Sequence, residues 1–312
     1  MFTISVDRLN HCSADSGYLK NELEKVFRLI DVLNTMRGHP FLKDCFVLKG
    51  GTAINLFYYS LPRLSVDVDL NYIRHLDKDK MHEDRKEIES IVQDVFYKEY
   101  EIRKSKDAHA LLQFEFRYNT ISKSSDKLKL DINFLQRIPY LEPRILAANW
   151  FGYSAEFLVL TLEEILASKI IAMLTRYTPR DLFDIYQTAI QTLDLDKQKL
   201  HELVLLYALI SRERVFEIFK VKWGNLSDQD INRFLYPMLI SGHRPSRDEM
   251  IESVQAFISP LISISEHERD ALEQFYMSGE LHLQGLITNE VLKKRYYSSP
   301  ALQWKIGHLK DH

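Results

Sequence analysis

The chain has 312 residues, enough for one large domain or two ordinary ones. Hydrophobic residues make up 46% of it and charged residues 27%, a composition that argues against a disordered chain. The formal net charge is −3, so charge alone indicates neither a nucleic-acid nor a membrane partner, and a nucleic acid would need a local basic patch. Two cysteines, Cys12 and Cys45, are too few for a disulfide framework or a zinc site.

No targeting or membrane segment is expected. Residues 1–10 carry Asp7 and Arg8 and lack the apolar core of a signal peptide. No stretch approaches the length needed to cross a bilayer. The sequence therefore predicts a cytoplasmic protein with no membrane partner.

The first half of the chain mixes helical and strand-like patterns. Apolar residues recur with helical spacing over 17–36, 52–59 and 79–97. Short apolar runs or strict alternation predict strands at 46–48, 66–71, 111–118 and 127–134. The polar stretch 119–126 predicts a hairpin turn between the last two strands.

From about Thr161 the apolar period becomes helical and stays helical. Leu162, Ile165, Leu166, Ile170 and Met173 form one stripe, and six further helical patterns follow, at 180–191, 195–211, 213–221, 227–240, 247–257 and 264–278. We therefore expect an α/β (α+β) domain over residues 1–160, followed by an all-helical domain over residues 161–312.

The segment Lys49-Gly50-Gly51-Thr52 lies at the predicted strand-to-helix turn. Glycines there allow backbone N–H groups to approach a phosphate, and a helix N-terminus favours negative charge. Thr52 adds a hydroxyl. An ordinary tight turn is the alternative, and a Gly-Gly pair alone favours it.

Three aspartates occupy polar positions of predicted strands. Asp67 and Asp69 are two apart on one strand, so both carboxylates project from the same face. Adjacent anions repel unless a cation lies between them, and hard oxygen ligands suit Mg²⁺. Asp131, on the polar face of a later strand, could complete a two-metal cluster. The alternative is a solvated strand face, although Asp is poorly suited to strands.

The order of these features resembles the polymerase-β-type nucleotidyltransferase superfamily. It runs strand, Gly-Gly-Thr turn, short helix, strand with Asp-x-Asp, then a strand with a third Asp. In that superfamily the turn holds a triphosphate and the three acids bind Mg²⁺. The resemblance implies a polymerase-β-like core with a mixed sheet, an NTP substrate, and Mg²⁺ as the cofactor, with Mn²⁺ as a second candidate.

Four pieces of sequence more closely resemble the AbiEii/AbiGii toxin family. They are Leu48–Ala53, Arg63–Leu70, Glu163–Lys169 continuing to Arg176, and Pro179–Tyr186. In that family a nucleotidyltransferase is the toxin of a toxin–antitoxin pair, and some members add nucleotides to the tRNA acceptor end. The resemblance implies tRNA as acceptor, a cognate antitoxin, and a helical domain that completes the active site and contacts the acceptor.

Lys169 falls on the apolar stripe of its helix, where a charge is costly unless it is used. It could meet the triphosphate, or its head could reach water while its stem covers apolar surface. Thr178-Pro179-Arg180-Asp181 resembles a capping box with Pro at the first helical position. Asp181 could therefore simply cap a helix.

Asp184 lies one turn after Arg180 and could pair with it. The family resemblance implies that this segment is functional, with Asp181 preferred over Asp184. Ser65 could assist nucleotide binding or shape the entry to its strand. The tract Lys293–Tyr297 interleaves cations with aromatics, which can bind nucleic acid, but we favour a solvated tail or helix end.

These features predict a Mg²⁺-dependent nucleotidyltransferase with Asp67, Asp69 and Asp131 as metal ligands. The residues that would hold the nucleotide are Lys49, Gly50, Gly51, Thr52, Ser65, Arg180 and Asp184. Lys169, which would also meet the phosphates, and Asp181 join the three acids as expected catalytic residues. Three alternatives stay open: a phosphotransferase acting on a protein or other acceptor, a nucleotide-binding module without catalysis, and a structural role for the aspartates.

Overall fold

The computed structural model describes residues 4–191, 193–240, 242 and 244–310. The chain separates into two compact units. The sheet unit comprises Met1–Arg137, Pro143–Leu160 and Tyr236–Arg244, and the helical unit comprises Ile138–Glu142, Thr161–Leu235 and Pro245–His312. Two short segments therefore belong to a different unit from the residues before and after them: Ile138–Glu142 to the helical unit, and Tyr236–Arg244 to the sheet unit.

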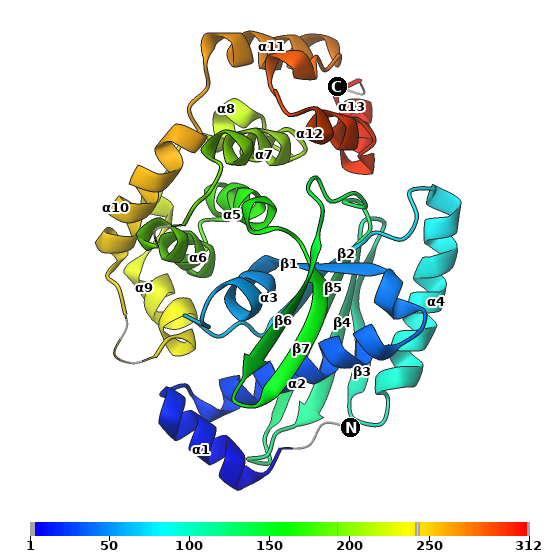
Figure 1. Cartoon of the computed structure of the whole chain (residues 1–312), viewed down its shortest axis with the longest axis vertical. Helices are drawn as coiled ribbons and strands as arrows, with labels where there is room; N and C mark the ends of the chain where they lie inside the picture. The colour runs from blue at the N-terminus through cyan, green and yellow to red at the C-terminus, as the bar shows by residue number, and fades with distance from the viewer. Residues whose placement is uncertain (1–3, 192, 241, 243, 311–312) are drawn as a thin grey trace. The chain divides into compact units, whose positions relative to one another are not determined.

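The sheet unit is built on a mixed seven-stranded sheet with the strand order β3-β4-β5-β2-β1-β7-β6 (Figure 1). The strands are β1 (Phe46–Lys49), β2 (Asp67–Tyr72), β3 (Glu101–Ala108), β4 (Leu111–Asn119), β5 (Ser125–Asn133), β6 (Arg144–Trp150) and β7 (Tyr153–Val159). β2 pairs with β5 in parallel, as β1 does with β7, and the other pairs are antiparallel. β4 and β5 form the hairpin that the sequence predicts.

One face of the sheet is apolar because the side chains of each strand alternate between the two faces. The inward residues are at most 1% exposed: Val68, Leu70, Phe114, Phe116 and Leu130. Helix α4 (Lys78–Phe96) packs on this face through Phe96, whose ring lies 5.1 Å from that of Phe116. Helix α2 (Lys20–Gly38) covers it through Arg28, 4.1 Å from the Tyr118 ring. The polar residues of the same strands therefore point to the opposite face.

A short helical segment follows the Gly-Gly turn, where the sequence predicts a helix. It consists of one α turn, α3 (Gly50–Ala53), continued by a π-helical turn, η2 (Ile54–Tyr58). Trp150 Nε1 donates to the Leu56 carbonyl at 2.9 Å, and the Tyr58 hydroxyl donates to the Leu160 carbonyl at 2.7 Å. These two bonds fix the segment against β6 and the end of β7.

Several elements were missed from the sequence: α1 (Val6–Ser16), α12 (Glu290–Tyr297), α13 (Pro300–Lys310) and strands β3, β6 and β7. β3 and β6 are the two edges of the sheet, and most of their residues are exposed. An edge strand that buries little side-chain surface lacks the apolar alternation by which the other strands are recognised.

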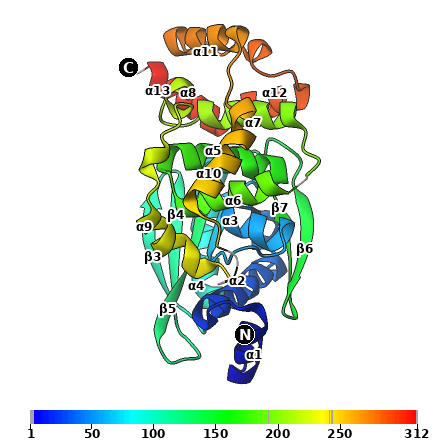
Figure 2. The same cartoon turned by 90° about the vertical axis from the view of Figure 1, so that its left-hand side faces the viewer.

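The helical unit contains the other α-helices, which Figure 2 shows from a second direction. They are α5 (Leu162–Arg176), α6 (Pro179–Ile190), α7 (Lys197–Leu209), α8 (Val215–Ile218), α9 (Asp228–Asp230), α10 (Arg247–Ile258), α11 (Glu266–Ser278), α12 and α13. Residues 203–206 of α7 are fully buried, so this helix forms the centre of the unit. The predicted α+β fold, a mixed sheet followed by a helical C-terminal region, is confirmed. No helix in the described part of the chain is both long and apolar enough to cross a membrane.

A buried carboxylate joins the segment Ile138–Glu142 to α5. Glu164 accepts hydrogen bonds from the backbone N–H groups of Tyr140 and Leu141, each at 2.9 Å, and from the Tyr207 hydroxyl at 3.1 Å. Burial raises the pKa of Glu164 to about 7, although the hydrogen bonds from Leu141 and Tyr140 oppose the shift. A single carboxylate thus satisfies three buried donors.

Glu164 should make stability depend on pH. The pKa of this carboxyl group in an unfolded chain is about 4.5, so between that pH and about 7 the folded chain binds more protons than the unfolded chain. As the pH rises through this window, the free energy of unfolding should fall by up to about 1.4 kcal/mol per pH unit. Glu164→Gln should lose this contribution, as urea titrations between pH 4.5 and 7.5 can measure. A stability difference between the two proteins that does not change with pH would contradict the expectation.

Candidate active site

The turn after β1 requires glycine at both positions. Gly50 has φ = +73°, and a Cβ atom there would lie 2.3 Å from Asp69 Oδ2. A Cβ on Gly51 would lie 2.7 Å from Arg63 Nη2 and 2.9 Å from Ser65 Oγ. The backbone of the turn is therefore in close contact with the Asp69 carboxylate, and only glycine leaves the space for it.

Thr52 connects the turn to the start of β2. Its hydroxyl donates to the Asp67 carbonyl at 2.5 Å and lies 3.1 Å from Ser65 Oγ, and the side chain is 1% exposed. These contacts give Thr52 and Ser65 a local structural role. Their predicted role in holding phosphate stays a prediction.

The three predicted acids lie on one face of two adjacent strands. In the parallel pairing of β2 with β5, Asp69 is level with Asp131, and Asp67 is level with Lys129. Burial raises the pKa of Asp131 above its usual value. The hydrogen bond from Gln113 opposes this shift and the charge of Asp67 adds to it. The charge of Asp67 thus disfavours the ionised form of Asp131, while the charges of Lys129 and Lys49 favour it.

A divalent cation would relieve this repulsion, and carboxylate oxygens are the ligands that Mg²⁺ prefers. In the described part of the chain, no group of three or more Asp, Glu, His or Cys side chains stands ready to hold a metal ion. Carboxylate oxygens suit a metal by their chemistry, but the described side chains are not gathered as a set of ligands, so the assignment of Asp67, Asp69 and Asp131 stays a prediction.

Gln113 positions Asp131, a role that was not predicted from the sequence. Gln113 Nε2 donates to Asp131 Oδ1 at 2.7 Å, and Ser105 Oγ donates to Gln113 Oε1 at 3.0 Å. The two hydrogen bonds fix the orientation of the amide between β3 and β5. Gln113 was recognisable only as a polar position of an alternating strand, because the register that sets it opposite Asp131 comes from the structure.

Lys169, Asp181 and Asp184 form a second charged cluster, inside the helical unit. Lys169 Nζ lies 3.1 Å from Asp181 Oδ1 and 2.6 Å from Asp184 Oδ2, and all three side chains are buried. Asp181 also accepts from Arg176 at 3.0 Å and from the Thr178 hydroxyl at 2.6 Å. Lys169 therefore does not place its head in water, one of the two alternatives that the sequence left open.

The charges in this cluster determine the protonation state of Asp181. Burial alone would raise its pKa, but the charges of Lys169 and Arg176 and the hydrogen bond from Thr178 hold that pKa well below its usual value. Pro179 is the first residue of α6 and Thr178 its N-cap, as predicted, but the Thr178 side chain makes no capping hydrogen bond to the backbone. Its hydroxyl donates instead to Asp181, whose carboxylate binds cations of α5.

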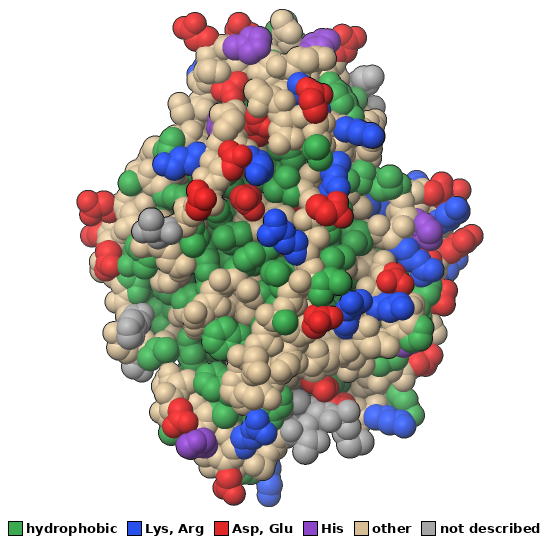
Figure 3. Space-filling view, in the orientation of Figure 1, with side chains coloured by type: hydrophobic (Ala, Val, Ile, Leu, Met, Phe, Trp, Pro, Cys, Tyr) green, Lys and Arg blue, Asp and Glu red, His purple; other side chains and the backbone are tan. Residues whose placement is uncertain are grey.

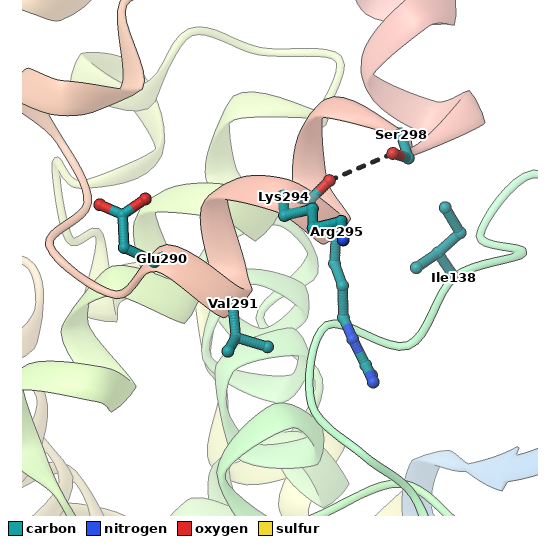
Figure 4. Close-up of a pocket in the computed structure, with 6 residues that line it drawn as sticks. All are labelled: Ile138, Glu290, Val291, Lys294, Arg295 and Ser298. Atoms are coloured by element: carbon teal, nitrogen blue, oxygen red, sulfur yellow. Dashed lines mark hydrogen bonds between the residues drawn. The ribbon is translucent and has the colours of Figure 1, made fainter.

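The tract Lys293–Tyr297 lies on α12 and contributes to the packing of the helical unit. Lys293 pairs with Glu290 at 2.7 Å, Arg295 donates to the Pro139 carbonyl at 3.1 Å, and Tyr296 is fully buried. A pocket of about 520 Å³ is lined by Ile138, Glu290, Val291, Lys294, Arg295 and Ser298 (Figure 4). The tract thus lies on an ordered helix, and its interpretation as solvated is wrong for Tyr296, which is fully buried.

The fold and the site together define the class of protein. A mixed sheet that carries a Gly-Gly turn beside an Asp-x-Asp strand, followed by a helical region, is the arrangement of a polymerase-β-like nucleotidyltransferase. Residues 31–274 match the model of the family described as "Nucleotidyl transferase AbiEii toxin, Type IV TA system". The chain belongs to this family of nucleotidyltransferase toxins, as its sequence motifs predict.

One solved structure supports the fold. The chain is similar to MenT4, a nucleotidyltransferase toxin from Mycobacterium tuberculosis, with a TM-score of 0.61 and 15% identity, over 97% of this chain and 99% of that one. It also matches JHP933 from Helicobacter pylori with a TM-score of 0.46 and 18% identity, over 88% of this chain and 97% of that one. No curated protein sequence matches the chain.

Gly50→Ala should displace the Asp69 carboxylate, because the new Cβ would lie 2.3 Å from its oxygen at a positive φ. The left-handed backbone alone costs about 1 kcal/mol. Gly38→Ala is the matched control, since a Cβ there meets nothing within 4 Å. Thermal unfolding should show a clear loss of stability for Gly50→Ala and none for Gly38→Ala. Equal melting temperatures for both variants would contradict the geometry of the turn.

Lys169→Met should destabilise the helical unit, because it leaves Asp181 and Asp184 buried without the cation between them. Removing one partner from a buried ion pair costs about 3–5 kcal/mol. Lys197→Met, at an exposed lysine of α7, should cost less than about 0.5 kcal/mol. Urea unfolding measures both, and a similar small effect of the two substitutions would show that the cluster does not stabilise the fold.

Proposed function

We propose that this chain is a Mg²⁺-dependent nucleotidyltransferase that transfers a nucleotide from an NTP to the 3′ end of a tRNA. The observation that carries the proposal is the position of Asp69, level with Asp131 on the neighbouring strand and in contact with the Gly50 turn. Membership of the AbiEii family supports nucleotidyl transfer and implies an antitoxin partner. MenT4, which shares the fold, is itself a nucleotidyltransferase toxin.

Asp67, Asp69 and Asp131 would hold the cation, and Lys49, Gly50, Gly51, Thr52 and Ser65 would contact the triphosphate. A bound Mg²⁺ would supply activation of the attacking hydroxyl and stabilisation of the leaving group. The acceptor oxygen would form a bond to the α-phosphorus, the bond between the α- and β-phosphates would break, and pyrophosphate would leave with that electron pair. The turn would orient the α-phosphate for in-line attack.

We also propose that Lys169, Arg180, Asp181 and Asp184 act on the nucleotide from the helical unit. The burial of Lys169 between two carboxylates supports a fixed cationic position. Lys169→Arg keeps the charge, so it should keep the fold while changing the KM for NTP. An unchanged KM would leave the cluster with a structural role alone.

A transfer assay with Asp67→Ala tests the reaction. The intact protein, Mg²⁺ and total tRNA are incubated with each NTP labelled at the α- or the γ-phosphate, and Asp67→Ala should lose at least a thousandfold in rate. Activity retained by Asp67→Ala would contradict the assignment of Asp67 as a metal ligand. An α label that enters RNA establishes nucleotidyl transfer and identifies the base. A γ label that enters protein would establish phosphotransfer instead. NTP binding without transfer of either label would indicate an inactive module.

A further inference from the structure

The face of the sheet that carries the acids continues outward across β5, β4 and β3. We call this surface the open face and define it by Glu101, Arg103, Lys106, Gln113, Glu115, Arg117, Lys127, Lys129 and Asp131. The residues share one side of the sheet because directly opposed pairs, such as Arg103 with Glu115 and Lys106 with Gln113, project together. α2 and α4 pack on the opposite side.

The open face is strongly cationic beyond the acid cluster. Without Asp131 it carries five cations (Arg103, Lys106, Arg117, Lys127, Lys129) against two carboxylates (Glu101, Glu115), a local charge of +3. With Asp131 the charge of the face is +2, in a chain whose net charge is −3. The side chains of Arg103, Arg117 and Lys127 are 57%, 39% and 43% exposed, so the charge faces solvent. Charge of this sign and local density attracts a polyanion.

Two of the five cations are available for new contacts. Glu115 accepts from both Lys127 and Arg117, and Glu101 accepts from Arg103. Lys106 and Lys129 are exposed, and neither forms an ion pair with a residue that the structure describes. Lys129 lies beside the acid cluster, where its charge lowers the pKa of Asp131, and Lys106 lies two strands further out. The two lysines therefore define a line across the sheet, from the acid cluster on β5 to the edge strand β3.

The side-chain types along this line favour contacts with a phosphate backbone over contacts with bases. Recognition of unpaired bases uses aromatic side chains for stacking, and the open face as defined contains none. Lysine and arginine contacts to phosphates position a nucleic acid without reading its sequence.

We propose that the open face binds the sugar–phosphate backbone of the RNA acceptor, through Lys106 and Lys129, and so leads its 3′ end to the acid cluster. The proposal rests on the proposed function for the presence of an RNA acceptor and adds the surface that holds it. Binding is independent of RNA sequence and sensitive to salt.

The test is the affinity of the full chain for fluorescently labelled tRNA, measured by anisotropy without NTP over a series of salt concentrations. Lys106→Gln combined with Lys129→Gln should weaken binding at least tenfold. The slope of log K against log salt should become shallower by about 1.4 to 1.8, the loss of two phosphate contacts. The matched control combines Lys80→Gln with Lys86→Gln on α4, where Figure 3 shows charges of both signs interspersed. It should leave affinity and slope unchanged.

Equal affinities for the wild type and the open-face variant would overturn the proposal, as would failure of the wild type to bind tRNA at low salt. Equally tight binding of polyglutamate would also overturn it, because the face would then select any polyanion. Since the assay contains no NTP, loss of binding in the variant supports the surface even where no transfer is detected. If the wild type transfers a nucleotide but the open-face variant binds tRNA as tightly as the wild type, the proposed function stands and the proposed RNA-binding surface is wrong.

Discussion

Like-charged carboxylates on adjacent strands repel one another, and the sheet unit is arranged to keep them together. The parallel pairing of β2 with β5 sets Asp69 level with Asp131, and Gly50 leaves room for the Asp69 side chain. Gln113 donates to Asp131, which partly offsets the effect of burial on its pKa. A buried carboxyl group with a perturbed pKa, such as that of Asp131, is a candidate for a functional site.

The chain has two acidic clusters in which carboxyl groups are buried, and neighbouring charges change their pKa values differently. In the helical unit the side chains of Lys169 and Arg176 supply the compensating positive charge. They contact Asp181 and lower its pKa. In the sheet unit burial dominates and the pKa of Asp131 is raised. The first arrangement is internally balanced and resembles a structural ion pair. In the second, the charges of Lys129 and Lys49 act in the same direction but do not outweigh burial, so the pKa of Asp131 stays raised.

Much of this arrangement could be predicted from the sequence because it depends on local spacing. The alternation at 66–71 places Asp67 and Asp69 on one face, and the glycine pair indicates the turn. What the sequence could not supply is register, because any strand can in principle pair with any other. The position of Asp131 opposite Asp69, the contact of Gln113 with Asp131 and the partners of Lys169 all depend on long-range pairing. The edge strands β3 and β6 escaped prediction because their exposed side chains follow no apolar period.

Residues 236–244 belong to the sheet unit although most of the helical unit precedes them in the chain. The Met238 carbonyl accepts from the Leu64 N–H at 2.9 Å, just before the Asp-x-Asp strand. During synthesis the ribosome must therefore release most of the helical unit before the last segment of the sheet unit becomes available. Formation of the whole sheet unit is coupled in this way to synthesis of the chain through residue 244, so a chain truncated before that residue does not contain the whole acid-bearing unit.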